Sequence, residues 1–430
     1  MSAPLKVGLA GLGTVGVGTF RLLAEQVDLI ARRCGRRVQV VAVCARDRKA
    51  DRGIDLEGVR WHDDARALAS DPEVEVVAEL IGGADGAALE LCRQAIANGK
   101  HVVTANKALL AHHGTRLAAA AEERGVSLAF EAAVAGGIPI IKALREGLAG
   151  NRVARAYGIL NGTCNYILTA MRDGGREFEE ALREAQRLGY AESDPTFDVD
   201  GIDTAHKLAI LTAVAFGCPM NFDAVYIEGV RHVTAMDIAF ARELGYHVKL
   251  LGIAGLTEDG IEQRVHPCMV SLDDPIAHVD GVFNAIVVEG ASVDRAMFVG
   301  RGAGAGPTAS AVVADLMDIA RFRHLPAFNV PTAELKEIAP APMERHWGAC
   351  YVRLMVVDRP GVMADVTAAL RDEEVSIEAM IQRGRDPGEV VPVVMTTHET
   401  EEAAMARAVA NIARLRTVLE PPRMIRIEKL

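Results

Sequence analysis

Two charged residues four positions apart mark the stretch of the chain that is best suited to chemistry. Asp203 and Lys207 lie in the segment IDTAHKLAILTAVAF, which is apolar on almost every side from Leu208 onward. Residues at i and i+4 of a helix share a face, so the carboxylate and the ammonium should meet along an apolar stripe. Buried charge is costly and is often kept for function. Lys207 is therefore a candidate proton donor to a carbonyl, with an ordinary helix ion pair as the alternative.

Two loops add polar groups that suit the charged ends of an amino acid. Glu192 lies in the acidic, turn-rich loop before this helix and can hold an ammonium group, with a surface carboxylate as the alternative. The loop Asn161-Gly162-Thr163 can cap the helix that follows it and offer N–H groups to a carboxylate. Cys164, in the same loop, is not expected to be a nucleophile, because no histidine is near it in sequence.

A glycine-rich loop follows the first apolar strand, Leu5–Ala10, and opens a helical pattern. In this context the string GLGTVG indicates a dinucleotide site, because small residues let the main chain approach a pyrophosphate at a helix N-terminus. A tight turn without a ligand is the alternative. The residues expected at the dinucleotide are Gly11, Gly13, Thr14, Val15 and Gly16.

The loop after the second predicted strand, Val38–Cys44, bears on the choice of dinucleotide. An acidic residue at this point would hold the ribose 2′-hydroxyl of NAD. The chain instead reads ARDRK, and Arg46 suits a 2′-phosphate, so NADP is favoured, although Asp47 leaves NAD possible. A solvated basic loop is an equally weighted alternative.

Three more loops are candidates for ligand contacts. Thr104 and Lys107, in TANK, follow the predicted strand His101–Thr104 and should lie beside the nicotinamide. Gly306 belongs to a second glycine loop, which can close over the dinucleotide or simply return the chain to the first domain. In EAAVAGGIP, Glu131 and converging carbonyls can form an oxygen-lined cation site, or the glycines can serve as a hinge.

The elements that must position these loops alternate between strand and helix through the N-terminal third. This order predicts an open, mostly parallel sheet with helices on both faces and ligands beyond the carboxyl ends of the strands. Besides those named above, the predicted elements are strands Val74–Leu80 and Val126–Phe130 and helices Ala87–Ala97 and Ala108–Arg124.

The middle of the chain changes to an α+β pattern with a mixed or antiparallel sheet. Its predicted strands are Val153–Leu160, Val248–Gly255, Ile261–Met269 and Asn284–Glu289. Helices are predicted at Ile140–Leu148, near Asp200 and at Ala309–Arg321.

The C-terminal segment predicts a βαββαβ, ferredoxin-like module after a proline-containing linker, Phe322–Gly348. Asp358 and Gly361 lie in its first turn, at a helix N-terminus suited to the charged ends of an amino-acid effector. A sheet this small leaves one face to be covered, often by another copy, and a purely structural appendage is the alternative. Its predicted elements are strands Ala349–Val357, Ile377–Arg383, Val390–Thr397 and Met424–Glu428 and helices Val362–Arg371 and Glu401–Leu415.

Composition narrows the class of protein. The 430 residues suggest about three domains, and the net charge of −11 argues against nucleic acid or an anionic membrane as a partner. The seven scattered cysteines without CxxC spacing predict thiols in a reducing cytoplasm. The chain starts on a strand rather than a signal-peptide pattern, and no apolar run reaches the roughly 20 residues of a membrane span.

Taken together, the motifs resemble the monofunctional homoserine dehydrogenase family with a C-terminal ACT domain, over essentially the whole chain. In order, they are GLGTVG, TANK, FEAAVAGGIPI, NGTCNYIL, GYAESDPTFDVDGIDTAHKL and GAGPTAS. The resemblance implies NAD(P)-dependent interconversion of L-homoserine and L-aspartate 4-semialdehyde in threonine, methionine and isoleucine biosynthesis. It also implies feedback by threonine through the ACT domain and a homodimer or homotetramer.

The resemblance also implies roles for residues. Lys207 would be the proton donor and Lys107 the second catalytic lysine, while Glu192 and Asp203 would hold the substrate amino group and order the site. Cys164 stands where many members have a second threonine, which affects only local hydrogen bonding. A sodium site would be formed by Glu131 and the main-chain oxygens of Val134, Gly136 and Ile138.

The domains implied are a Rossmann domain at 1–135 with a returning segment at 305–330, a catalytic and dimerisation domain at 136–304, a linker at 331–348 and the ACT domain at 349–430. Among rival readings, a hydroxy-acid dehydrogenase should carry a histidine–carboxylate pair and a semialdehyde dehydrogenase a catalytic cysteine. A sensor that binds NADP and an amino acid without catalysis is the third.

Overall fold

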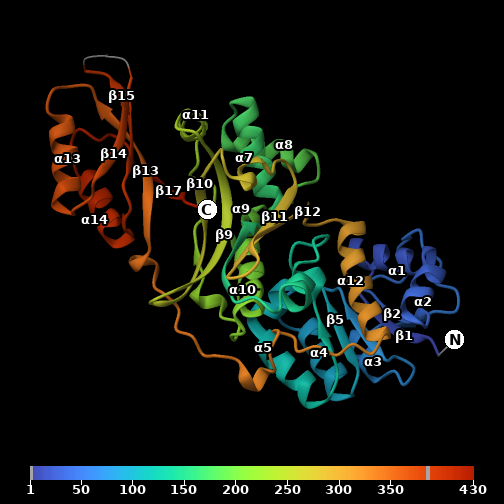
Figure 1. The fold of residues 1–430 in the computed structure, drawn as a ribbon. Coiled ribbons are helices and arrows are strands. Elements are labelled where there is room, and N and C mark those ends of the chain that lie inside the picture. Colours follow the sequence, from blue (N-terminus) through green and yellow to red (C-terminus); the bar gives the residue numbers. More distant parts are fainter. Residues whose placement is uncertain (1–2, 384–387) are drawn as a thin grey trace.

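A computed structural model describes residues 3–383 and 388–430 (Figure 1). Its N-terminal part is a six-stranded parallel sheet with the order β3-β2-β1-β4-β5-β6, as the alternating pattern predicts. The central strands are buried on both faces, which explains their continuous apolar sequences. The strands are β1 Leu5–Ala10, β2 Val38–Cys44, β3 Arg60–His62, β4 Val76–Glu79, β5 His101–Thr104 and β6 Leu128–Ala129.

Helices cover both faces of this sheet (Figure 1). They are α1 Thr14–Glu25, α2 Val27–Cys34, α3 Ala65–Ser70, α4 Ala87–Ala97, α5 Lys107–Glu123 and, from the far side of the middle domain, α12 Ala305–Ala320. The returning α12 packs against α1. It begins four residues before the predicted Ala309, because Pro307 is tolerated in the first turn of a helix. The short elements β3 and α3 were not predicted, since their sequences have no apolar periodicity.

The middle and C-terminal parts share one mixed sheet of 11 strands, with the order β12-β11-β7-β9-β10-β17-β13-β15-β14 and with β8 and β16 attached at its sides. The predicted strands of both parts are present, and β12, which forms a hairpin with β11, was missed. The strands are β7 Val153–Ile159, β8 Tyr226–Ile227, β9 Tyr246–Thr257, β10 Gly260–Ser271, β11 Phe283–Gly290, β12 Asp294–Arg301, β13 Trp347–Val357, β14 Ile377–Gln382, β15 Val390–Thr397, β16 Thr400–Glu401 and β17 Arg423–Glu428.

The helices of the middle domain cover the sheet near β7 and β9, and α10 is the most deeply buried of them. Every residue from Asp203 to Val214 is buried, as the nearly all-apolar sequence predicts. The predicted helix Ile140–Leu148 is a short α-helix that widens after one turn. The helical segments are η1 Glu131–Ala133, α6 Ile140–Lys142, η2 Ala143–Gly147, α7 Gly162–Gly174, α8 Phe178–Arg187, α9 Thr196–Val199, α10 Ile202–Phe216, η3 Phe222–Ala224, α11 Ala235–Glu243 and η4 Pro275–His278.

The C-terminal module has the predicted βαββαβ order, with antiparallel neighbours β17-β13-β15-β14. Its helices, α13 Val362–Asp372 and α14 Glu402–Ile412, pack on one face of the sheet, and the linker before it carries the short turns η5 Thr332–Glu334 and η6 Met343–Arg345. Its last strand, β17, pairs in parallel with β10 of the middle domain. The module is thus joined edge to edge to the strands of the middle domain.

Part of the second face of the C-terminal sheet, at β13, is covered within the chain, while β14 is largely exposed. Tyr351 and Arg353 of β13 donate hydrogen bonds to the carboxylate of Asp237 on α11, over 3.1 and 2.6 Å. All three side chains are buried. At this position, a helix of the same chain takes the place in which a second copy was expected.

Of the helices in the described ranges, none has the length and apolar character that a membrane span needs. All seven cysteines are free thiols.

Candidate active site

Asp203, in the first turn of α10, is the centre of the site. Its carboxylate accepts hydrogen bonds from the ammonium groups of Lys207 and Lys107, each over 2.7 Å, and from Asn161 Nδ2 over 2.8 Å. The N-terminus of a helix favours a negative charge. The structure therefore brings together both predicted lysines and the predicted aspartate, although Lys107 is about 100 residues away in sequence.

The two lysines have different surroundings. Lys207 is buried, and its Nζ also donates to the main-chain oxygen of Leu160 over 2.7 Å. Lys107 is the first residue of α5, keeps 34% of its side chain exposed, and lies 5.6 Å from the centre of the Phe197 ring. Lys207 is therefore held in one orientation, while Lys107 faces the open side of the site.

Burial and mutual charge separate the proton affinities of these groups. Burial and the nearby ammonium of Lys107 lower the pKa of Lys207, against the attraction of Asp203. Burial also opposes the charge on Lys107, but the carboxylate of Asp203 outweighs it and raises the pKa. Burial disfavours the charged form of Asp203 too, yet the two ammonium groups hold its pKa well below the ordinary value. Lys207 is consequently the more acidic ammonium of the pair.

The predicted substrate loop closes the site from the side of β7. Asn161 caps α7 by accepting from the Cys164 main-chain N–H over 2.8 Å. Thr163 Oγ1 donates to the main-chain oxygen of Tyr190 over 2.6 Å, which ties this loop to the loop containing Glu192. Glu192 itself is exposed, and its charge acts on Lys107. The loop directs the N-terminus of α7 at the site. The main-chain N–H groups of a helix N-terminus can bind an anion such as a carboxylate.

Cys164 is not equipped as a nucleophile. Its side chain is buried and donates to the main-chain oxygen of Asp198, and burial raises the pKa of the thiol well above its ordinary value.

The first glycine loop has the shape that a dinucleotide needs. A Cβ on Gly11, which has φ of 98°, would overlap the carbonyl of Leu80, and one on Gly16 would overlap the carbonyl of Gly11. Gly13 instead faces open space, next to Thr14 and Val15 in the first turn of α1. These residues fit a pyrophosphate at the helix N-terminus.

The other predicted cofactor contacts are distributed around this loop. Arg46 is exposed just beyond β2, and Gly306 faces open space in the first turn of α12. The Thr104 hydroxyl is already engaged, because it donates to the buried carboxylate of Glu79 over 2.6 Å and accepts from the Asn106 N–H over 3.0 Å. Its side chain therefore shapes the turn, and only its main chain is free to contact a cofactor.

Glu131 lies where the resemblance implies a cation. Both of its carboxylate oxygens accept main-chain N–H groups at the start of α6, from Ile141 over 2.9 Å and Lys142 over 2.8 Å. Burial and the neighbouring carboxylate of Asp315 raise the pKa of Glu131 to about 7. The ammonium of Lys142 contacts the buried carboxylate of Asp315 and the partly exposed carboxylate of Asp318, while Lys142 reaches Glu131 through its main-chain N–H. This acidic donor set fits a small cation.

The backbone beside Glu131 turns sharply. Ala135 and Gly136 have φ of 54° and 42°, and the Ile138 carbonyl already accepts from the N–H of Ile140 over 2.8 Å. Val134 and Gly136, whose carbonyls were predicted as the other main-chain ligands, flank Ala135 in this turn.

Sequence reasoning missed several residues of the site. Asp198 accepts from Asn161 Nδ2 over 2.8 Å, and its position five residues before Asp203 gave no helical spacing that would have linked them. Asn106 accepts from the Leu109 N–H and caps α5, a role that its place before the helix would have suggested. Glu79 accepts from Thr104 and from two N–H groups, and a charge at the end of an apolar strand was the available signal.

The predicted effector turn leads into α13. The main-chain N–H of Asp358 donates to the Glu389 carbonyl over 2.9 Å, and Gly361 has φ of 94° directly before the helix. This turn is far along the sheet order from the Asp203 centre.

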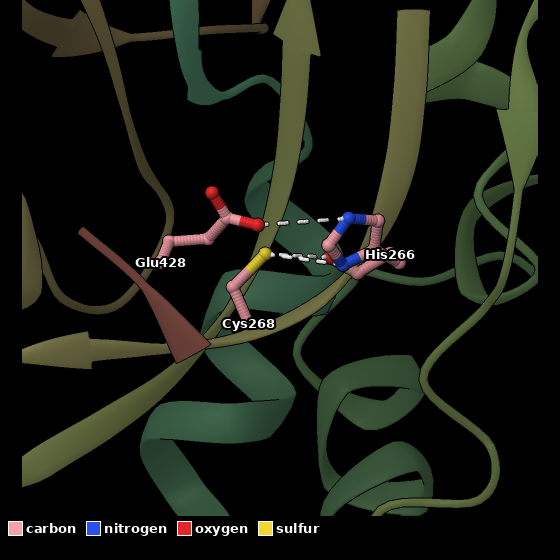
Figure 2. A group of neighbouring side chains, drawn as sticks. All are labelled: His266, Cys268 and Glu428. Carbon is pink, nitrogen blue, oxygen red and sulfur yellow. Dashed lines mark hydrogen bonds and ion pairs between the residues drawn. The ribbon is translucent and has the colours of Figure 1, made fainter. Parts of the chain in front are cut away.

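A second cluster of ligand-type side chains lies at the joint between β10 and β17. His266, Cys268 and Glu428 are buried with their ligand atoms within 4.8 Å of one another, the one such trio in the described ranges (Figure 2). The guanidinium of Arg264 donates to both His266 Nε2 and the carboxylate of Glu428. Because this guanidinium already supplies the cation between the two ligands, the cluster is an ion-pair joint rather than a metal site.

A glycine loop on a parallel sheet, facing two lysines that share one buried carboxylate, defines a nicotinamide-dependent oxidoreductase. Comparison with known families assigns the same parts. Residues 11–131 match the NAD binding domain of homoserine dehydrogenase, residues 139–317 match homoserine dehydrogenase, and residues 351–416 match the ACT domain.

Relatives agree over the full length. The chain is 47% identical to the homoserine dehydrogenase of Pseudomonas aeruginosa and 46% identical to that of Neisseria gonorrhoeae, with 99% of each chain covered. A crystal structure of a homoserine dehydrogenase from Thiobacillus denitrificans has a TM-score of 0.94 at 49% identity, covering 99% of this chain and 98% of that one. The chain belongs to the homoserine dehydrogenase family and carries a C-terminal ACT domain.

A more distant structure is that of a hyperthermophilic archaeal homoserine dehydrogenase in complex with NADPH. Its TM-score is 0.63 at 26% identity, and it covers 73% of this chain and 97% of that one.

Proposed function

We propose that the chain interconverts L-homoserine and L-aspartate 4-semialdehyde, with NADP favoured over NAD. The observation that carries the proposal is the buried carboxylate of Asp203 shared by Lys207 and Lys107. A bound nicotinamide dinucleotide supplies or accepts the hydride. It would be held by the glycine loop, by the main chain at Thr104 and by Gly306, with Arg46 near a 2′-phosphate.

In the reducing direction, negative charge develops on the aldehyde oxygen. Lys207 hydrogen-bonds this oxygen and gives it a proton, and the lowered pKa of Lys207 favours that transfer. Lys107, whose ammonium keeps its charge, stabilises the developing oxyanion. Asp203 holds both lysines in place, and in the oxidising direction Lys207 takes the hydroxyl proton back.

The amino-acid part of the substrate has matching groups. Glu192 receives the ammonium, and Asn161, Gly162 and Thr163 present the N-terminus of α7 to the carboxylate. This arrangement would select a substrate with both charged ends.

The direct test is an assay with purified protein. Adding L-aspartate 4-semialdehyde to the protein with NADPH, and separately with NADH, should consume the reduced nicotinamide at the same rate as homoserine appears. A protein that binds the dinucleotide without turnover would instead be a sensor, and the proposal would fail. The ratio of the two rates measures the cofactor preference.

We also propose that Glu131 and the main-chain oxygens of Val134, Gly136 and Ile138 bind sodium. The support is the raised pKa of a buried carboxylate that has no ammonium partner of its own. At pH 8, sodium chloride should raise the melting temperature above that in choline chloride, and Glu131→Gln should remove the difference. Equal melting curves in the two salts would contradict the site.

The remaining proposals concern organisation and regulation. We assign residues 1–135 and 305–330 to the cofactor domain, 136–304 to the catalytic and dimerisation domain, 331–348 to the linker and 349–430 to the ACT domain. Threonine is the proposed effector, bound near Asp358 and Gly361. We place a homodimer or homotetramer in the cytoplasm, where seven free thiols are stable, in the biosynthesis of threonine, methionine and isoleucine.

A further inference from the structure

One buried polar side chain near the site has no role in the scheme above. Asn284, near the start of β11, is 1% exposed, and neither Nδ2 nor Oδ1 has a hydrogen-bond partner in the described part of the chain. A buried amide that makes no hydrogen bond is rare, because it loses its bonds to water and gains none in return. Such a group indicates a second arrangement in which it is paired.

The register of the sheet places Asn284 at the wall of the active site. Ala285 pairs with Ile159 between antiparallel β11 and β7, so continuing by one residue sets Asn284 opposite Leu160. The Leu160 carbonyl is the group that accepts from Lys207 Nζ. Directly opposed residues of an antiparallel pair point to the same face. A Cβ on Gly252 of β9 would lie 3.1 Å from the side chains of both Leu160 and Thr204 of α10, so Leu160 points to the face that α10 covers. The amide therefore lies on the face that carries α10.

Two glycines lie against this amide from two different loops. A Cβ on Gly302 would overlap the Asn284 amide, and a Cβ on Gly162 would lie 2.7 Å from the Val282 oxygen and 3.5 Å from Asn284 Oδ1. Gly162 belongs to the substrate loop, and Gly302 to the crossover that leads from β12 into α12. Asn284 is thus packed between the substrate loop and the second glycine loop.

The loop at Gly302 also contacts the turn at Gly136 and Gly137, where the chain leaves the first domain. The N–H of Gly137 donates to the Arg301 carbonyl over 2.9 Å, and a Cβ on Gly136 would overlap the neighbouring Gly302 carbonyl. Gly304, with φ of 119°, follows before α12. A shift of the segment 301–304 would therefore move Asn284 against the substrate loop. It would also move the start of α12, which packs on the cofactor domain.

We propose that Asn284 is a positioning residue that couples dinucleotide binding to the substrate loop. When the segment 301–304 contacts a bound dinucleotide, its main-chain groups form hydrogen bonds with Nδ2 and Oδ1 of Asn284. The amide, held in this way, fixes the position of Gly162 in the substrate loop. The inference rests on the proposed function, since it needs the second glycine loop to contact the cofactor. It adds a residue that binds neither ligand but links their two loops.

The test separates a positioning role from a merely structural one. Asn284→Leu keeps the branched shape of the side chain but removes its hydrogen bonds, and Asn284→Ala is a smaller variant that cannot clash with Gly302. Both should raise the Kd for NADPH or NADH, whichever the wild type binds more tightly, by roughly tenfold or more. The melting temperature of Asn284→Leu without dinucleotide should equal or exceed that of the wild type, because an unpaired buried amide has been removed.

The matched control is Gln263→Leu on β10. Gln263 is also a buried amide with an oxygen that has no partner in the described residues, but it lies away from both glycine loops. Its Kd for dinucleotide should stay at the wild-type value. Unchanged Kd values in both Asn284 variants would overturn the coupling. A lower melting temperature of Asn284→Leu together with a raised Kd of Gln263→Leu would also overturn it, because the effect on the Kd would then come from lost stability. A wild type that binds neither dinucleotide would overturn the proposed function itself.

Discussion

At the scale of single residues, the site depends on one carboxylate that pairs with two ammonium groups. Asp203 is buried with two lysines and one amide as partners, so its pKa stays low and its carboxylate orients both lysines. Burial acts differently on the two lysines, because Lys207 is enclosed and Lys107 is partly exposed. The proposed division between proton donor and electrostatic stabiliser rests on that difference.

Replacing Lys207 tests this division. Lys207→Met keeps the length of the side chain and leaves Asp203 paired with Lys107 and Asn161, so the fold and dinucleotide binding should persist. The turnover number for homoserine oxidation should fall by about 10²–10⁴-fold. Lys100→Met is the matched control, because Lys100 is a buried lysine whose Nζ donates to the carbonyls of Asp71 and Val74 in the first domain. Activity of Lys207→Met within tenfold of wild type would rule out its role.

A second prediction concerns pH and the histidine next to Lys207. His206 is buried with its ring stacked on Phe222 at 4.4 Å, and burial, with a smaller effect of His112, lowers its pKa to about 4. The unfolded chain binds a proton near pH 6.5, so between about pH 6.5 and 4 the unfolded state holds more protons and stability falls as the pH falls. At pH 5 this loss should amount to about 2 kcal/mol.

His206→Phe should remove that part of the pH dependence, because phenylalanine does not titrate and fits the aromatic cluster. Urea unfolding at pH 7 and pH 5 measures the change. His232→Phe, at an exposed position, is the control and should leave the wild-type difference unchanged. The same loss between the two pH values in His206→Phe and wild type would contradict the assignment.

At the scale of elements, local sequence patterns predicted the helices and strands and their buried faces. They did not predict which residues, distant in sequence, contact one another in the fold. The apolar run after Asp203 predicted the buried α10, and alternation predicted both sheets. Thr104 was predicted to contact the cofactor, yet its hydroxyl is taken by Glu79, which is adjacent only in the folded sheet. The pairing of β17 with β10 joins residues about 160 positions apart, and no periodicity in either strand encodes its partner.

The joint between β10 and β17 gives a prediction for stability. Arg264 is 2% exposed and donates to both oxygens of Glu428 from the last strand. Removing one partner of a buried pair leaves the other charge uncompensated, so Glu428→Ala should lower the free energy of unfolding by about 3–5 kcal/mol. Arg264→Met combined with Glu428→Leu should recover much of this loss, because neither charge is then buried. Urea unfolding of the wild type, Glu428→Ala and the double variant measures it, and a loss in the double variant as large as that in Glu428→Ala would contradict the pairing.

At the scale of the whole molecule, the ACT domain and the active site are parts of one continuous structure. Tyr351 and Arg353 of the ACT sheet hold Asp237, which also caps α11 together with Thr234. Helix α11 packs against α7, whose first residues form the substrate loop. The ACT sheet, α11 and α7 are therefore joined by direct contacts. Deleting residues 349–430 would expose this interface and the edge of β10, so truncation cannot isolate regulation from stability.

A single hydroxyl offers the cleaner test of regulation. Tyr351→Phe removes one hydrogen bond to Asp237 and leaves Arg353 paired, so the fold and basal activity should be retained. If threonine acts through this contact, the variant should bind threonine with wild-type affinity in calorimetry but be inhibited less, with a loss of coupling of about 2- to 30-fold. Tyr157→Phe is the matched control, because Tyr157 is a buried tyrosine that donates to Glu289 within the catalytic sheet. Its inhibition curve should match that of the wild type, and equal inhibition of Tyr351→Phe would show that the signal crosses the sheet elsewhere.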